Sequence, residues 1–193
     1  MAEHPIICTS DSVRGILDGR KTQTRRIINP QPVVFDRAGQ PDYANLTDHK
    51  KKWRICDTLW VRETWQAGIE WDDEKPGDID PLCGGNDINY IADGKNPTEG
   101  WGKVRPSIFM PRWAARIFLE ITNIRVEEIQ DIDAVEAEAE GIRRPKRLCP
   151  DRHDEYILER FQRLWDSINA KRGYGWDENL WVRVVEFRKQ LPK

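Results

Sequence analysis

Residues 19–26 of this chain concentrate four cations, two threonine hydroxyls and a glutamine amide in eight consecutive positions. An arginine guanidinium binds phosphate or carbonyl oxygens in a fork, and a lysine supplies a mobile point charge, so this composition suits an anionic or strongly hydrogen-bonding ligand. Lys21 also stands three residues before Thr24, which makes an amine–hydroxyl pair available for nucleophilic chemistry. The alternative is a solvated basic turn without a ligand. The four cations are Arg20, Lys21, Arg25 and Arg26.

The amine–hydroxyl pair sets conditions on its surroundings. A threonine hydroxyl is a weak nucleophile unless a base removes its proton, and lysine is a base only in its neutral form, which burial and the neighbouring Arg20 or Arg25 favour. In a regular strand, positions 21 and 24 point to opposite faces. The pair therefore requires a turn, a bulge or a helix end at this point of the chain.

Local patterns predict the elements that position the basic segment. Residues 5–8 form a short apolar run, and Thr9 or Ser10 can cap a helix whose apolar residues fall at helical spacing. Gly19 is well placed to end that helix, so the basic segment emerges from a helix end. The apolar residues of the predicted helix are Val13, Ile16 and Leu17.

Later segments alternate in the manner of strands, at 58–65, 115–126 and 180–187. Glu63 falls on the apolar parity of the first of these, so it is either a strand-end residue or a buried carboxylate facing a cation. A short helix is expected over 134–140, capped by Asp131 or Asp133 and ended by Gly141. A long helix over 154–171 should bury a stripe of apolar residues. That stripe consists of Ile157, Phe161, Leu164 and Ile168.

The composition bounds the protein class. With 193 residues, we expect one domain over 1–193 with loop insertions at about 33–52 and 66–103. The formal net charge of −2 excludes a bulk polycation, so an anion site must be a local patch. The four cysteines and three histidines are scattered, which predicts no disulfide framework and no metal site, and no cofactor is expected. No apolar run is long enough for a bilayer, and the cytoplasm is the expected compartment.

Strands with helices between them indicate an α+β fold, a mostly antiparallel β-barrel decorated by helices. Four segments, in this order, resemble the ASCH domain family, whose β-barrel is related to the PUA fold, and more closely its larger phage- and prophage-associated members. Together they cover nearly the whole chain outside the loops at 33–52 and 66–100. The segments are Gly19-Arg20-Lys21-Thr22-x-Thr24-x-Arg26, Asp57-x-Leu59-Trp60-Val61-Arg62-Glu63-Thr64-Trp65, Met110-Pro111-Arg112-Trp113-Ala114-x-Arg116 and Trp181-Val182-x-Val184-Val185-Glu186-Phe187.

The resemblance implies binding of RNA or of a modified nucleoside or nucleotide in a cleft beside the barrel. One ASCH branch comprises N4-acetylcytidine amidohydrolases, which use a lysine, a threonine and a glutamate. Lys21 and Thr24 match the first two residues and Glu140 matches the third, although Glu136 and Glu138 lie close by.

Three functions stay open for this chain: hydrolysis of the amide of an N4-acylated cytosine nucleoside, non-catalytic reading of RNA or of a modified base, and a metal-dependent nuclease activity. The nine tryptophans are either core residues or include one or two that stack on a base. The expected ligand-binding residues, beside the catalytic candidates, are Arg20, Thr22, Arg25, Arg26, Arg62, Glu63, Trp65, Arg112 and Trp113.

Overall fold

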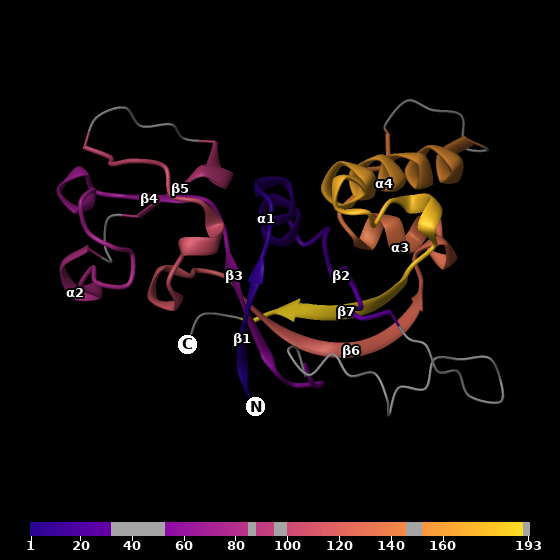
Figure 1. Ribbon diagram of the computed structural model, residues 1–193, viewed down its shortest axis with the longest axis horizontal. Coiled ribbons are helices and arrows are strands. Elements are labelled where there is room, and N and C mark those ends of the chain that lie inside the picture. Colours follow the sequence, from indigo (N-terminus) through magenta and orange to yellow (C-terminus); the bar gives the residue numbers. More distant parts are fainter. Residues whose placement is uncertain (32–52, 85–87, 95–99, 146–151, 191–193) are drawn as a thin grey trace. The chain divides into compact units, whose positions relative to one another are not determined.

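The structure is a computed structural model that describes residues 1–31, 53–84, 88–94, 100–145 and 152–190 (Figure 1). The chain divides into two compact units. Unit 1 comprises residues 1–19, 56–121 and 188–193, and unit 2 comprises residues 20–55 and 122–187. The predicted insertion at 33–52 lies outside the described residues. That the whole chain counts as one domain stays a prediction.

Five strands form one sheet in the order β1-β3-β6-β7-β2, and a second sheet pairs β4 with β5. Within the larger sheet, β1 (Glu3–Ile7) pairs in parallel with β3 (Thr58–Arg62), whereas β3 and β6 (Phe118–Glu128) are antiparallel, as are β2 (Gln23–Ile27) and β7 (Trp181–Lys189). The fold is therefore α+β, as predicted. Among the described strands β1 and β2 end the order, so closure into a barrel stays a prediction.

Unit 1 begins with local structure that the sequence specifies directly. Helix α1 (Ser10–Leu17) has Thr9 as its N-cap, and the Thr9 hydroxyl accepts a hydrogen bond from the backbone N–H of Ser12. Gly19 follows the helix with φ +73°, a left-handed conformation that glycine adopts without a steric penalty. The predicted cap, helix and stop signal are all confirmed.

The predicted strand 58–65 is two strands. β3 ends at Arg62, and β4 (Trp65–Ala67) pairs instead with β5 (Ile88–Tyr90), so the chain leaves the larger sheet at Glu63 and Thr64. The alternation of side chains continues through the break, which is why the sequence pattern did not reveal it. The segment 66–103, expected as a loop, contains β5, the end of β4 and short helical turns.

Short helical elements connect these strands in the described residues. None of the helices there is long and apolar enough to cross a membrane. The short elements are α2 (Pro81–Gly84) and the 3-10 turns η2 (Ile69–Trp71), η3 (Ile91–Asp93), η4 (Ser107–Phe109), η5 (Arg112–Ala114), η6 (Ile129–Asp131), η8 (Ala170–Arg172) and η9 (Trp176–Glu178).

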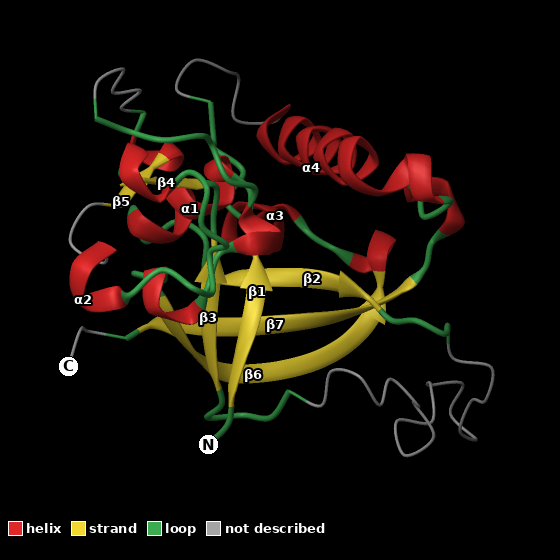
Figure 2. Ribbon diagram, turned by 60° about the vertical axis from the view of Figure 1, so that its left-hand side comes forward, coloured by secondary structure: helices red, strands yellow, loops and turns green. Residues whose placement is uncertain are grey.

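In unit 2, helices α3 (Ala134–Ala139) and α4 (His153–Asn169) pack with the strands β6, β7 and β2, and α3 lies between α4 and the strands (Figure 2). Asp133 caps α3 through a reciprocal capping box with Glu136. The core of this unit joins both helices to β7, and it includes Ile129, Ala137, Ile157, Phe161, Trp165, Val182 and Val184.

The buried stripe of α4 differs from the prediction in its second half. Ile157 and Phe161 are buried as expected, but Leu164 and Ile168 are 38% and 48% exposed. Trp165 is buried in their place, and its indole N–H donates to the carbonyl of Tyr174. A residue spacing of four keeps the large indole over the core, and its single polar group finds a partner at the helix end.

Candidate functional site

The basic segment runs along β2 in unit 2, and its side chains alternate between two faces. Gln23 and Arg25 bond to groups of α3 and its surroundings, and Lys21, just before the strand, continues the same parity toward Glu140. On the other parity, the Thr24 hydroxyl accepts a hydrogen bond from Arg26 at 2.8 Å. The period of two along the strand therefore sets Lys21 and Thr24 apart.

Lys21 and Glu140 form a buried ion pair. The Lys21 ammonium donates to the Glu140 carboxylate at 2.6 Å and to the Glu140 backbone carbonyl at 2.8 Å, and each side chain is only 6% exposed. These are the hydrogen bonds of Lys21 within the described residues, and Thr24 is not among its partners. The lysine and the glutamate of the predicted triad thus meet although 119 residues separate them.

Gly141 permits this approach. It follows α3 with φ +102°, a conformation that strains any other residue. A Cβ added there would lie 3.3 Å from the Cβ of Lys21, which is tighter than ordinary packing. The helix therefore ends at a glycine for two reasons: its backbone turns left-handed, and the lysine lies against it.

Arg25 is the centre of the charged cluster. Its side chain is 1% exposed, and its guanidinium bonds the carboxylates of Glu127, Glu136 at 2.7 Å and Glu140 at 3.4 Å. The guanidinium also lies 5.9 Å from the ring centroid of Phe161 on α4. Because Lys21 holds one oxygen of Glu140 and Arg25 holds the other, that carboxylate is fixed between two cations.

A second arginine carries the cluster toward the solvent. Arg125 on β6 is 29% exposed and bonds Glu127, Glu136 and Glu186. Burial lowers the pKa of Arg125, but hydrogen bonding and charge from these three carboxylates outweigh it, so its pKa lies above the ordinary value. Arg125, Glu127 and Glu186 are not among the site residues predicted from the sequence, because no local pattern connects β6 and β7 with β2.

The three neighbouring glutamates of α3 have distinct partners. Glu140 pairs with Lys21, Glu136 with Arg25 and Arg125, and Glu138 with Arg144 outside the buried cluster. The geometry therefore selects Glu140 as the partner of Lys21, in agreement with the residue match.

The remaining candidates of the basic segment lie nearer the solvent. Arg20 is half-buried and donates to the carbonyl of Gly141 at 2.8 Å, beside the buried pair. Thr22 is exposed, and Arg26 is half-buried on the face of Thr24. The four cations thus do not share one face of β2: Lys21 and Arg25 are internal, whereas Arg20 and Arg26 reach the surface.

The other five predicted ligand-binding residues belong to unit 1: Arg62, Glu63, Trp65, Arg112 and Trp113. Arg62 lies over the ring of Trp60 at 4.7 Å and donates to a backbone carbonyl. Arg112 is exposed and pairs with Glu3. Trp65 and Trp113 pack edge to face in an apolar cluster, with ring centroids 6.0 Å apart. Their predicted role beside the cations of unit 2 stays a prediction.

Glu63 is a buried carboxylate facing a cation, which resolves the alternative left open by its position. It is 1% exposed, and Arg116 grips both of its oxygens, at 2.9 and 3.0 Å. Arg116 also holds Asp93 and lies 3.9 Å from the ring centroid of Tyr90. Burial raises the pKa of Glu63 above 4.5, and Arg116 offsets this only in part. Burial likewise raises the pKa of Tyr90 to about 12.

Within the described part of the chain, no cluster of three or more histidine, cysteine, aspartate or glutamate side chains is arranged to hold a metal ion.

No protein-family model and no curated protein sequence matches the chain. A solved ASCH domain structure from Lactobacillus crispatus JV V101 is similar, with a TM-score of 0.44 and 10% identity, over 97% of this chain and 79% of that one. A likeness at that level carries no argument, and the resemblance to the ASCH family stays one of residue pattern.

Proposed function

We propose that this protein is an ASCH-family protein that binds nucleic acid or a modified nucleoside at the Lys21–Glu140 pair and hydrolyses the amide of an N4-acylated cytosine nucleoside there. The observation that carries the proposal is the buried contact of 2.6 Å between these two side chains. A buried ion pair is costly to desolvate, and in some proteins such pairs are retained because they contribute to specificity. We assign a chemical role to this one. The order of motifs that resembles the ASCH family supplies the substrate class.

Proton transfer between Lys21 and Glu140 is the chemical capacity of this pair. When the Lys21 proton moves to the Glu140 carboxylate, the amine becomes neutral and can act as a general base. It then takes a proton from an attacking oxygen as that oxygen bonds to the acyl carbon. The carbon–N4 bond breaks, and N4 receives the proton that Glu140 or Lys21 holds. The products are the free carboxylic acid and the cytosine nucleoside.

Water is the attacking oxygen in this proposal. The Thr24 hydroxyl lies on the strand parity opposite to Lys21 and accepts a hydrogen bond from Arg26. A direct proton transfer from that hydroxyl to the amine needs a hydrogen bond of about 3 Å between them. Within the described residues, the Lys21 amine bonds Glu140 and not Thr24. Thr24 then serves to position Arg26 rather than to form an ester.

Residues at the surface end of the basic segment would hold the rest of the ligand. Arg20 contacts the Gly141 carbonyl and reaches the solvent, and the neighbouring Thr22 is exposed. A half-buried guanidinium beside the buried pair can bind a phosphate or a pyrimidine carbonyl in a fork. We therefore assign Arg20 to ligand binding and Arg25 to holding Glu140 in place.

A non-catalytic reader of RNA or of a modified base is the second candidate, and one observation favours it. Both oxygens of Glu140 are already bonded to cations, and Lys21 is bonded to Glu140 twice. Groups that are satisfied by each other stabilise a binding site without taking part in a reaction.

The decisive experiment incubates the full chain with N4-acetylcytidine, free and within a short RNA, and measures the release of cytidine and acetate by mass. We expect release by the wild type and its loss in Lys21→Met and Glu140→Gln, because two members of one catalytic unit fail together. Binding without any release would establish the reader instead. If the chain neither binds the nucleoside or RNA nor releases acetate, both functions are rejected.

Two further variants sharpen this test. Glu138→Gln is the matched control, because it makes the same change two residues away on the same helix, at a side chain paired with Arg144 outside the buried cluster. It should retain the activity. Thr24→Val distinguishes the nucleophiles: retained activity without a trapped acyl adduct indicates water, whereas an acyl group on Thr24 in the wild type would indicate the hydroxyl.

A further inference from the structure

Arg105 in unit 1 is a buried cation whose hydrogen bonds, among the described residues, go to neutral groups. It is 5% exposed, and its guanidinium donates to the backbone carbonyls of Trp71 at 2.5 Å and Glu74 at 3.1 Å. It lies 5.7 Å from the ring centroid of Trp65, and its Nε has no hydrogen-bond partner among the residues that the structure describes. Within the described residues, no carboxylate forms an ion pair with it. A buried charge without a counter-charge is costly, and natural proteins normally pair it.

Two other arginines of the same unit have carboxylate partners. Arg112, on the segment that follows, pairs with Glu3, and Arg116 holds Glu63 and Asp93. Both are more exposed than Arg105, which therefore has the greater need of a counter-charge and finds none in the described part of the chain.

Three indole N–H groups of the same unit also have no acceptor among the described residues. The Nε1 atoms of Trp65, Trp71 and Trp113 are buried and have no hydrogen-bond partner in the part of the chain that the structure describes, and all three side chains belong to one apolar cluster. Trp65 and Trp113 pack edge to face at 86°, so the ring of one can serve as a weak acceptor for the other, but not both ways at once. At least two indole donors and the Arg105 Nε still lack an acceptor.

We propose that this cluster is a binding site for a compact oxyanion, a carboxylate or a phosphate. Every unsatisfied group of the cluster is an N–H donor, and its charge is positive, so the missing partner must present acceptor atoms and negative charge. Trp71 and Trp113 are half-buried, which gives the cluster an outer side toward the solvent. The site is independent of the function proposed for the Lys21–Glu140 pair.

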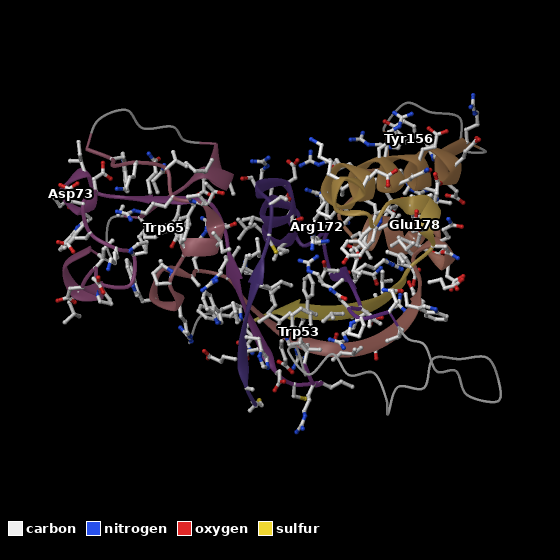
Figure 3. All side chains as sticks on the ribbon, viewed as in Figure 1. Trp53, Trp65, Asp73, Tyr156, Arg172 and Glu178 are labelled. Carbon is white, nitrogen blue, oxygen red and sulfur yellow. The ribbon has the colours of Figure 1, made fainter. Side chains whose placement is uncertain are left out.

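Within the described residues, the acidic turn next to the site forms no ion pair with Arg105. Residues 70–74 carry four carboxylates, yet Glu74 meets Arg105 through its backbone carbonyl. Asp72 accepts from the backbone N–H of Lys103 at 2.7 Å, and Asp73 lies exposed at the outer edge of this unit, away from Trp65 (Figure 3). Asp72, Asp73 and Glu74 therefore do not neutralise the guanidinium of Arg105.

The test titrates the full chain with sodium phosphate and with sodium acetate at constant ionic strength, with chloride as the reference, and follows tryptophan fluorescence and heat. A saturable response to phosphate or acetate, absent with chloride, is expected, and the arm that saturates names the anion. Arg105→Met should weaken binding about tenfold or more, as expected for the loss of a charged hydrogen-bonding partner.

Two variants keep the test decisive. Lys103→Met makes the same charge change at an exposed side chain two residues away, and it should bind within about twofold of the wild type, since exposed charges contribute little. Trp113→Phe keeps a ring and removes one N–H donor, so it should weaken binding even if Arg105→Met does not fold. The proposal is overturned if the wild type shows no saturable response, because the donors are then satisfied by buried water. Equal weakening by Lys103→Met would also overturn it.

Discussion

Replacing Arg25 with methionine should lower the free energy of unfolding of unit 2 by far more than the loss of one exposed charge would. The substitution keeps an unbranched side chain in a core position but removes a guanidinium that is 1% exposed and that bonds three carboxylates. Glu140 is 6% exposed and keeps Lys21, whereas Glu127 and Glu136 are 15% and 26% exposed and keep Arg125. The loss is therefore partly relieved by the remaining cations and by water.

The magnitude follows from this geometry. Breaking a buried ion pair by removing one partner costs about 3–5 kcal/mol, because the other charge stays buried. We expect a loss in that range, which is a large part of the roughly 5–15 kcal/mol that stabilises an ordinary domain. With a urea dependence of about 2–3 kcal/mol per molar, the unfolding midpoint should fall by about 1–2.5 M.

The assay is urea unfolding followed by tryptophan fluorescence, with hydrogen exchange of the β2 and β7 peptides to follow unit 2 by itself. Arg163→Met is the matched control in the same unit, because Arg163 pairs with Glu159 across 3.5 Å while 79% exposed. Such a pair contributes about 0.3–0.5 kcal/mol. If Arg25→Met shifted the midpoint no more than Arg163→Met, the idea that Arg25 compensates buried carboxylates would be refuted.

Three further outcomes are expected. Gly141→Ala should destabilise unit 2 by more than about 1 kcal/mol, measured by the same unfolding assay, and should lower any amidase activity, since φ is +102° and the new Cβ meets Lys21 at 3.3 Å. Tyr90 has a pKa raised to about 12, so its favourable contribution to folding stability is present below about pH 10 and is lost as the pH rises through 12. At about pH 11, Tyr90→Phe should leave the tyrosinate absorbance of the native protein nearly unchanged. The same substitution should lower the tyrosinate absorbance of the urea-unfolded protein. Burial raises the pKa of Glu63 in the folded state, so the stability of the wild type relative to Glu63→Gln should fall as the pH rises above 4.5; a rising difference over that range would contradict the burial argument.

The elements that the sequence predicted well are those specified within a few residues. The Thr9 cap, the Gly19 and Gly141 stops and the Asp133 cap depend on hydrogen bonds to the nearest helical turn, and each is found in the structure. The break after β3 was missed because Glu63 and Thr64 continue the alternation while their neighbours change partners. Exchange of a partner strand is a non-local event that alternation does not encode.

The candidate site shows the same limit more sharply. Lys21, Thr24 and Glu140 were selected by their resemblance to a family pattern, and nothing in the spacing of residues 21 and 140 brings them together. The buried state of Arg25 was also not predictable, because its carboxylates come from β6 and α3, about a hundred residues further along the chain. A run of four cations suggests a surface, but Lys21 and Arg25 are buried, as is Thr24 between them, and Arg20 and Arg26 are the half-buried members of the run.

That division has a consequence for how the basic segment works. The two inward cations are balanced by carboxylates, so they add little to the electrostatic attraction of an anionic ligand. Arg20 and Arg26, which reach the surface, must supply that attraction if the segment binds RNA. The salt dependence of RNA binding should therefore decrease in Arg20→Gln and Arg26→Gln, whereas Arg25→Met should act through stability. The charges at the surface of this segment thus determine affinity for RNA, and its charges in the core determine stability.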